Sequence, residues 1–129
     1  MMSLPNLGLL VLRCTFASMM FLNHGLEKFT NFSTVSSRFP NPIGIGSEWS
    51  AGLVVFAELF MSIFIFFGLF TRIACIPPVI AMGVAAFMIH ANDALERKEL
   101  ALLYFAAYVA IMLLGPGIYS LDKKFRNKI

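Results

Sequence analysis

The stretch VVFAELFMSIFIFF, residues 54–67, decides the fold of this chain. It holds one ionisable residue, Glu58, within an apolar run that extends from Trp49 to Thr71. Such a run can cross a bilayer as a helix, because a span needs about 20 predominantly apolar residues. Glu58 lies about nine residues from one end of the run, or roughly 13 Å deep at about 1.5 Å per residue. The stretch therefore predicts a transmembrane helix that carries a buried acidic group.

The composition of the whole chain indicates the same solvent. Of 129 residues, 59% are hydrophobic and 13% are charged, and the mean hydropathy is +0.81. A soluble domain has about 25% charged residues. This composition argues against a soluble globular fold, and we expect one integral membrane domain over residues 1–129.

Working outward from the central run, the chain divides into apolar segments separated by polar ones. Four segments are expected to span the membrane, at about 7–29, 49–71, 73–91 and 95–115. A loop rich in Pro, Gly, Ser and Asn is expected at 30–48, and a basic tail at 118–129. Asp93 and Glu96 have the spacing of a reciprocal helix cap, so the fourth helix should begin near Ala94. The predicted fold class is all-α, a four-transmembrane-helix bundle.

Basic residues in the loops predict the orientation of the bundle. If both termini are cytoplasmic, that side holds Arg72 and the tail cations Lys123, Lys124, Arg126 and Lys128, and the other side holds Lys28, Arg38, Arg97 and Lys98. The excess of basic residues favours both termini inside. No basic stripe interleaves with aromatic residues, so we expect no nucleic-acid partner.

Two charged residues within the spans allow two interpretations each. Glu58 can face the bundle interior and mark a functional pocket, neutralised by a partner or a proton, or it can be a protonated structural group bonded to a helix backbone or hydroxyl. Arg13 can snorkel to the cytoplasmic interface, or it can bind an anionic ligand between the helices. Its predicted depth argues against direct pairing with Glu58.

Polar residues gather at the predicted outer ends of the spans. His24, Glu27 and Lys28 share a face at the end of the first span, and His90 ends the third span at a similar level. With Glu58, such a cluster would suit proton-coupled chemistry, because imidazole titrates near neutrality and relays protons. Alternatively, these groups are helix ends wetted by water and lipid headgroups.

Other candidates near this cluster have structural explanations. Tyr104 and Tyr108 could hydrogen-bond in the same pocket or simply pack. Histidines on two helices could hold a haem, but the many Phe residues favour packing, so we expect neither haem nor another metal. Cys14 and Cys75 form no CxxC motif, and we expect both thiols to be inert.

The order of motifs along the chain resembles that of the DoxX family. The motifs are FLNHGLEKF closing the first span, FPNPIGIGS in the loop, AELFMSIFIFFGLFTR in the second span, AAFMIH ending the third and LLGPGIYSLDKKF after the fourth. The resemblance implies a small four-helix bacterial membrane protein. Some relatives are associated with thiosulfate-to-quinone electron transfer or with oxidative-stress and thiol-redox complexes. The resemblance also implies a multi-pass protein of the bacterial cytoplasmic (inner) membrane.

Matched by position, Gly25 and Lys28 correspond to the family's glycine and lysine, Glu58 to its acidic residue, and Gly115, Pro116, Gly117, Ser120, Leu121 and Asp122 to its terminal signature. Without a redox-active cysteine pair, electron transfer would need a quinone or a partner protein.

These observations lead to two competing hypotheses. In the first, the protein is a membrane subunit or accessory protein of an oxidoreductase system with a quinone-type pocket in the outer half of the bundle. The candidate residues are Glu58, His24 and His90 for proton transfer, and Lys28, Arg13 and Tyr104 for binding. In the second, it is a non-catalytic membrane protein that binds a partner or acts in stress or assembly, without a cofactor. A redox partner or a homo-oligomer is compatible with either hypothesis.

Overall fold

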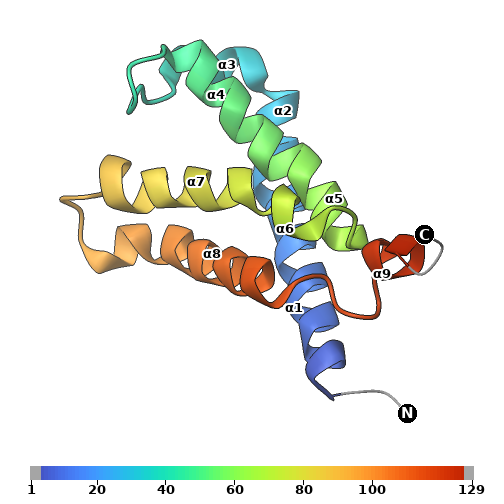
Figure 1. Cartoon of the computed structure of the whole chain (residues 1–129). Helices are drawn as coiled ribbons and strands as arrows, with labels where there is room; N and C mark the ends of the chain where they lie inside the picture. The colour runs from blue at the N-terminus through green and yellow to red at the C-terminus, as the bar shows by residue number, and fades with distance from the viewer. Residues whose placement is uncertain (1–3, 127–129) are drawn as a thin grey trace.

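The computed structural model of the protein describes residues 4–126, and all regular elements within that range are helical (Figure 1). Short π-helical turns, labelled η, interrupt the α-helices. The elements in chain order are α1 (Leu4–Met20), η1 (Phe21–Gly25), α2 (Leu26–Thr30), α3 (Phe32–Arg38), α4 (Ser47–Val55), η2 (Phe56–Phe60), α5 (Met61–Phe67), α6 (Thr71–Ala74), α7 (Ile76–Val84), η3 (Ala85–Ile89), α8 (Leu95–Leu114) and α9 (Leu121–Arg126).

Three helical stretches among the described residues are long and apolar enough to cross a membrane, at Leu4–Thr30, Ser47–Phe67 and Thr71–Ile89. They correspond to the first three predicted spans, and the all-helical fold class is confirmed. Helix α8 has 20 residues, but its first turns are charged, so a fourth span stays a prediction. The predicted loop at 30–48 contains the short helix α3. Helix α8 begins at Leu95, close to the predicted start. The predicted cap is not formed, because the Asp93 side chain bonds to His90 and not to the start of α8.

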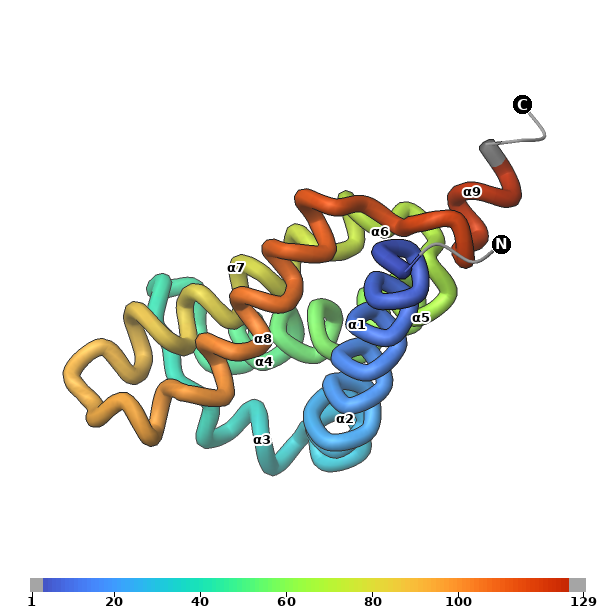
Figure 2. The backbone as a smooth tube through the Cα atoms, turned by 90° about the horizontal axis from the view of Figure 1, so that it is seen from below, coloured from blue at the N-terminus to red at the C-terminus, as the bar shows by residue number. Residues whose placement is uncertain are grey.

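The helices pack through small side chains and aromatic rings. Helices α7 and α8 run antiparallel side by side, and α1 lies against α5 (Figures 1 and 2). Fully buried alanines, such as Ala17 and Ala86, let backbones approach closely, as is usual between membrane helices. The buried cluster at the centre consists of Ala17, Met20, Ile65, Ala74, Cys75, Met82, Tyr104, Tyr108 and Ile111.

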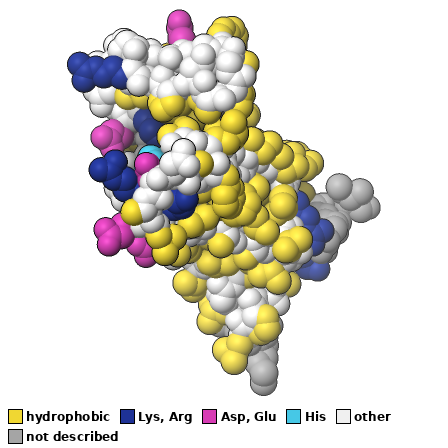
Figure 3. All heavy atoms as spheres, turned by 90° about the vertical axis from the view of Figure 1, so that its left-hand side faces the viewer, with side chains coloured by type: hydrophobic (Ala, Val, Ile, Leu, Met, Phe, Trp, Pro, Cys, Tyr) yellow, Lys and Arg dark blue, Asp and Glu magenta, His cyan; other side chains and the backbone are white. Residues whose placement is uncertain are grey.

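The outer surface of the bundle is largely hydrophobic. Figure 3 shows hydrophobic side chains over much of one face, with acidic and basic side chains gathered mainly toward one edge of it. Many large apolar side chains are exposed, among them Leu53, Phe56 and Ile80. A surface of this kind is stable in lipid and not in water, because contiguous exposed apolar area on soluble proteins is small.

The start of α1 and the segment after α8 lie at the same end of the molecule (Figure 2). The Ile118 main-chain N–H donates to the Asn6 side-chain oxygen at 3.3 Å. The Asp122 carboxylate accepts the main-chain N–H groups of Phe70 and Thr71 at 2.6 and 2.9 Å. Helix α9 is thereby fixed to the turn between α5 and α6. Lys128, one of the predicted tail cations, lies outside the described residues.

Candidate functional site

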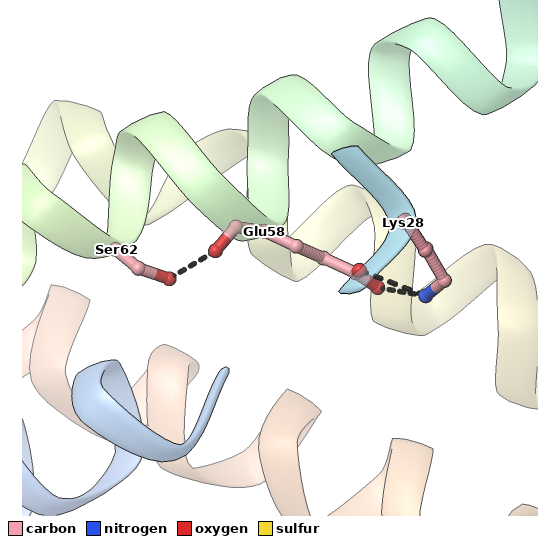
Figure 4. Close-up of polar contacts among 3 residues, drawn as sticks. All are labelled: Lys28, Glu58 and Ser62. Carbon is pink, nitrogen blue, oxygen red and sulfur yellow. Dashed lines mark hydrogen bonds and ion pairs between the residues drawn. The ribbon is translucent and has the colours of Figure 1, made fainter. Parts of the chain in front are cut away.

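The Glu58 side chain forms a buried ion pair with Lys28. Lys28 Nζ donates to both carboxylate oxygens of Glu58, at 2.9 and 2.8 Å (Figure 4). The Glu58 side chain is only 3% exposed, whereas that of Lys28 is 27% exposed. The carboxylate therefore lies inside the protein, and its cationic partner connects it toward the surface.

A glycine brings the two charged residues together. Gly25, in η1, lies so close to η2 that a Cβ atom there would come within 2.7 Å of the Leu59 main chain and 2.8 Å of the Glu58 carbonyl carbon. Lys28 follows Gly25 by one helical turn, so its stem starts beside Glu58. Only a residue without a side chain allows this approach.

Both partners of this contact lie in or next to π-helical turns, since η1 ends at Gly25 and η2 contains Glu58. A π-helical turn shifts the register of the helix and is frequent at functional sites. The Ser62 hydroxyl, one turn further along, donates to the main-chain oxygen of Glu58 (Figure 4). This bond satisfies a buried carbonyl at the point where the helix changes register.

An apolar cavity of about 370 Å³ adjoins the ion pair on one side. A volume of at least roughly 300 Å³ is typical of small-molecule sites. Its walls come from α4, η2, α7, η3 and the loop before α4, with Lys28 of α2 at its edge. The lining residues are Lys28, Phe39, Pro42, Ile43, Ser50, Leu53, Val54, Phe56, Ala57, Glu58, Pro77, Ile80, Ala81, Met82, Val84, Ala85 and Ile89.

Ser50 also lines this cavity, and it was not identified from the sequence as a candidate site residue. It is 6% exposed, and its hydroxyl has no hydrogen-bond partner among the described residues. Leaving a buried hydroxyl unpaired costs about 1–3 kcal/mol. A serine near the start of a helix gives no sequence signal of this kind, because serine is common at such positions as a cap.

A polar hollow of about 500 Å³ lies on the other side of the ion pair. It is lined by Asn23, His24, Glu27, Lys28, Asn31, Thr34, Val35, Arg38, Phe39 and Pro40. Lys28 and Phe39 line both the hollow and the apolar cavity. The Lys28–Glu58 pair thus stands at the boundary between an apolar compartment and a polar one.

The structure brings some of the other predicted site residues to this boundary and separates the rest. His24 lines the polar hollow, and its ring meets that of Tyr104 edge-on at 5.5 Å. Tyr104 in turn stacks on Tyr108, with ring centroids 6.0 Å apart. His90 lines neither space; its Nδ1 lies 2.7 Å from the Asp93 carboxylate in the turn between η3 and α8. That contact lowers the pKa of Asp93, chiefly through the hydrogen bond from the histidine ring.

Arg13 lies at the opposite end of the bundle and is bound by main-chain oxygens. Its guanidinium donates to Ile65 and Phe66, at the end of α5, at 2.8 and 3.2 Å. It also donates to Pro116 and Tyr119, in the segment after α8, at 2.7 and 2.9 Å. Arg13 therefore closes the base of the bundle and does not line either space beside Glu58.

The described residues contain no group of three or more His, Cys, Asp or Glu side chains that could hold a metal ion. The spaces beside Glu58 suit an organic molecule with an apolar body and few polar groups. Fold and site together define a small helical membrane protein with an ion pair buried between its helices.

Comparison with known proteins identifies the family. Residues 8–91 match the DoxX family, and the chain belongs to it. An uncharacterized protein of Haemophilus influenzae is 29% identical over 125 residues, covering 91% of this chain and 82% of the relative. A second uncharacterized protein of that organism is 31% identical over 116 residues, covering 84% of each chain. No solved structure matches the chain.

Proposed function

We propose that this protein is a membrane subunit or accessory protein of an oxidoreductase system and binds a lipophilic, quinone-type molecule in the apolar cavity. One observation carries the proposal: the Lys28–Glu58 pair separates an apolar cavity of ligand size from a polar hollow. A quinone has an apolar ring with hydrogen-bonding oxygens, which is the chemistry that this cavity offers.

The charged pair gives each of its members a role in this scheme. Reduction of a quinone takes up electrons and protons together; a partner redox protein supplies the electrons, and this chain conducts the protons. Glu58 exchanges the proton with the ligand, and Lys28 stabilises negative charge that develops on its oxygen. His24 lines the same hollow as Lys28 and passes the proton on. Arg13 and His90 lie elsewhere and have no part in the proposal.

The proposal places the protein in the bacterial inner membrane with α8 as a fourth span and both ends cytoplasmic. The apolar part of α8 starts at Leu100 and lies beside α7. Arg72, Lys123 and Lys124 belong to the end of the molecule that carries α9, and a basic excess marks the cytoplasmic side. Reporter fusions after residues 92 and 126 test this arrangement: the first should report the periplasm and the second the cytoplasm. A cytoplasmic reporter after residue 92 would contradict it.

The ligand is tested by mass analysis of an organic extract and an absorption spectrum of the protein purified in mild detergent. We expect a quinone in the wild-type extract and its loss in Glu58→Gln, which keeps the side-chain shape but removes the charge. His90→Ala is the matched control, because it removes an ionisable ring that lines neither space, and it should retain the quinone.

Two results would overturn the quinone proposal. If the wild-type protein carries no quinone and binds no added decylubiquinone, the second hypothesis, a non-catalytic partner-binding or assembly protein, takes its place. Copurification of a stoichiometric protein that is unaffected by Glu58→Gln would favour that role. A Soret band would show that the cofactor is a haem.

A further inference from the structure

We infer that the apolar cavity takes its ligand sideways from the bilayer, and that Ser50 binds an oxygen of the ligand head group while a hydrocarbon tail remains in the lipid. The inference rests on the proposed function, whose cavity it shares. It adds a binding residue, a route of access and the requirement for a tail.

Ser50 differs in its hydrogen bonding from Ser18 and Ser62, which also lie in the membrane-spanning helices. The hydroxyls of Ser18 and Ser62 donate to the main-chain oxygen four residues earlier, of Cys14 and Glu58 respectively. That is the usual solution for serine in such helices. Ser50 has no such bond, although it belongs to the lining of the cavity. Its buried hydroxyl keeps a free donor that rotation about the Cα–Cβ bond would turn toward a ligand.

A second buried hydroxyl, that of Thr71, also lacks a partner among the described residues. Thr71 is the first residue of α6, beyond the end of α5, and does not line the cavity. An unpaired buried hydroxyl is costly wherever it occurs, but only Ser50 of these two residues belongs to the lining of a space that can hold a molecule. The two residues thus differ in what can satisfy them.

Several residues that line the cavity are also exposed on the apolar outer surface, and we place the mouth of the cavity there. Leu53 and Phe56 on the α4–η2 stretch, and Ile80 on α7, line the cavity and are also exposed. All three are large and apolar, and they belong to helices long enough to span a membrane. In the inferred arrangement, a space bordered by such residues opens between the two helices into hydrocarbon rather than into water.

The size of the cavity limits what it holds. About 370 Å³ accommodates a ring-sized head group but not a complete lipid. The remainder of a membrane-borne ligand must extend through the mouth between Leu53 and Ile80. The occupant is thus an amphiphile with a compact, oxygen-bearing head and an alkyl or prenyl tail.

Equilibrium binding of decylubiquinone to the protein in lipid nanodiscs tests the role of Ser50, with binding to empty nanodiscs subtracted. Loss of one hydrogen bond should weaken binding about 2- to 12-fold in Ser50→Ala. Ser18→Ala is the matched control, because its hydroxyl bonds within its own helix, and it should bind like the wild type. Without ligand, Ser50→Ala should unfold at a higher denaturant concentration than the wild type, since an unpaired hydroxyl is removed.

The route of access is tested by obstructing the mouth. Ile80→Trp should slow or abolish decylubiquinone binding, and Ile63→Trp, on an exposed position that does not line this cavity, should not. Duroquinone, which has no tail, should bind the wild type more weakly than decylubiquinone after correction for partition into lipid.

The outcomes separate this inference from the function on which it rests. If the wild type binds no quinone, the proposed function fails. If the wild type binds decylubiquinone and Ser50→Ala binds it equally well, the role of Ser50 is refuted while the quinone site stands. Equal binding by Ile80→Trp would refute the lateral route in the same way.

Discussion

Substitution of Gly25 by alanine tests the close approach on which the whole site depends. The added Cβ would lie 2.7 Å from the Leu59 main chain, whereas ordinary contacts begin at 3.4 Å. Main-chain atoms cannot rotate away, so η1 and η2 would have to separate by about 0.7 Å. Lys28 Nζ, now 2.8 and 2.9 Å from the two Glu58 oxygens, would lose one or both of these bonds.

The expected cost combines opposing terms. Overpacking costs about 1–3 kcal/mol, and an alanine within a helix gains about 0.5–1 kcal/mol over glycine. The weakened ion pair adds to the cost, because Glu58 stays buried with a poorer partner. We expect Gly25→Ala to lower the free energy of unfolding by about 1–3 kcal/mol and to reduce decylubiquinone binding.

Reversible unfolding in mixed detergent micelles, followed by circular dichroism, measures this change. Gly8→Ala is the matched control, because it lies on the same long helix and its Cβ would meet nothing within 4 Å. It should be as stable as the wild type or slightly more stable. If Gly25→Ala matches Gly8→Ala in stability and in quinone binding, the two helices do not approach as described and the reasoning fails.

Three further predictions concern the supports of the fold. Arg13→Lys keeps the charge but cannot make the four hydrogen bonds of the guanidinium. A hydrogen bond between membrane helices contributes about 0.6–1.7 kcal/mol, so the substitution should lower the free energy of unfolding by about 1–4 kcal/mol without changing the quinone affinity. A parallel loss of affinity would contradict the separation of Arg13 from the cavity. Asp122→Asn should cost about 0.5–2 kcal/mol as a lost cap, seen as faster proteolysis after α8, and an unchanged digestion rate would refute it. In His90→Ala, the pKa of Asp93 should rise toward its ordinary 3.8 in carboxyl-carbon NMR. Because the pKa of Asp93 is lowered in the folded protein, the carboxylate stabilises the fold above pH 3.8, and this stability is lost as the pH falls through the lowered pKa. An unchanged titration of Asp93 in His90→Ala would show that the ring does not stabilise the carboxylate.

The helical fold was predictable from the sequence because length and hydropathy are local properties. An apolar run of the required length forms a helix in lipid whatever surrounds it, since its main-chain groups can be satisfied only within the run. The short helix α3 was not predicted, because residues 32–38 are mostly polar and form no apolar period. Its position depends on packing against α4.

The site was predictable in part, for reasons that differ between residues. Glu58 was identified because a carboxylate is costly in an apolar run. Lys28 was expected in the same cluster as Glu58, but their direct pairing was not identified, since the sequence places the lysine at the end of the first span and the acid deep in the second. The pairing depends on the close approach at Gly25 and on the π-helical turns, which are tertiary features.

The bonding partners of Arg13 and His90 could not be predicted from the positions of these residues in the sequence. The carbonyls that bind Arg13 become available because α5 ends at Gly68, whose φ of +70° stops the helix, and because the chain returns to this point after α8. His90 was predicted beside His24 on the basis of depth alone. Equal depth does not give equal azimuth around a bundle, and Asp93, three residues away, is the nearer partner.

Stability alone does not account for a Lys–Glu pair at this position. Removal of two charges from water costs several kcal/mol per ion, and replacement of such a pair by apolar residues is often neutral or stabilising. Here an apolar pair would merely extend the wall of a cavity that is already apolar, and it would not need a glycine contact to hold it. The polar hollow gives Lys28 access to water but leaves Glu58 only 3% exposed. The proposed quinone would give both groups a partner in the cavity, because its oxygens gain and lose protons.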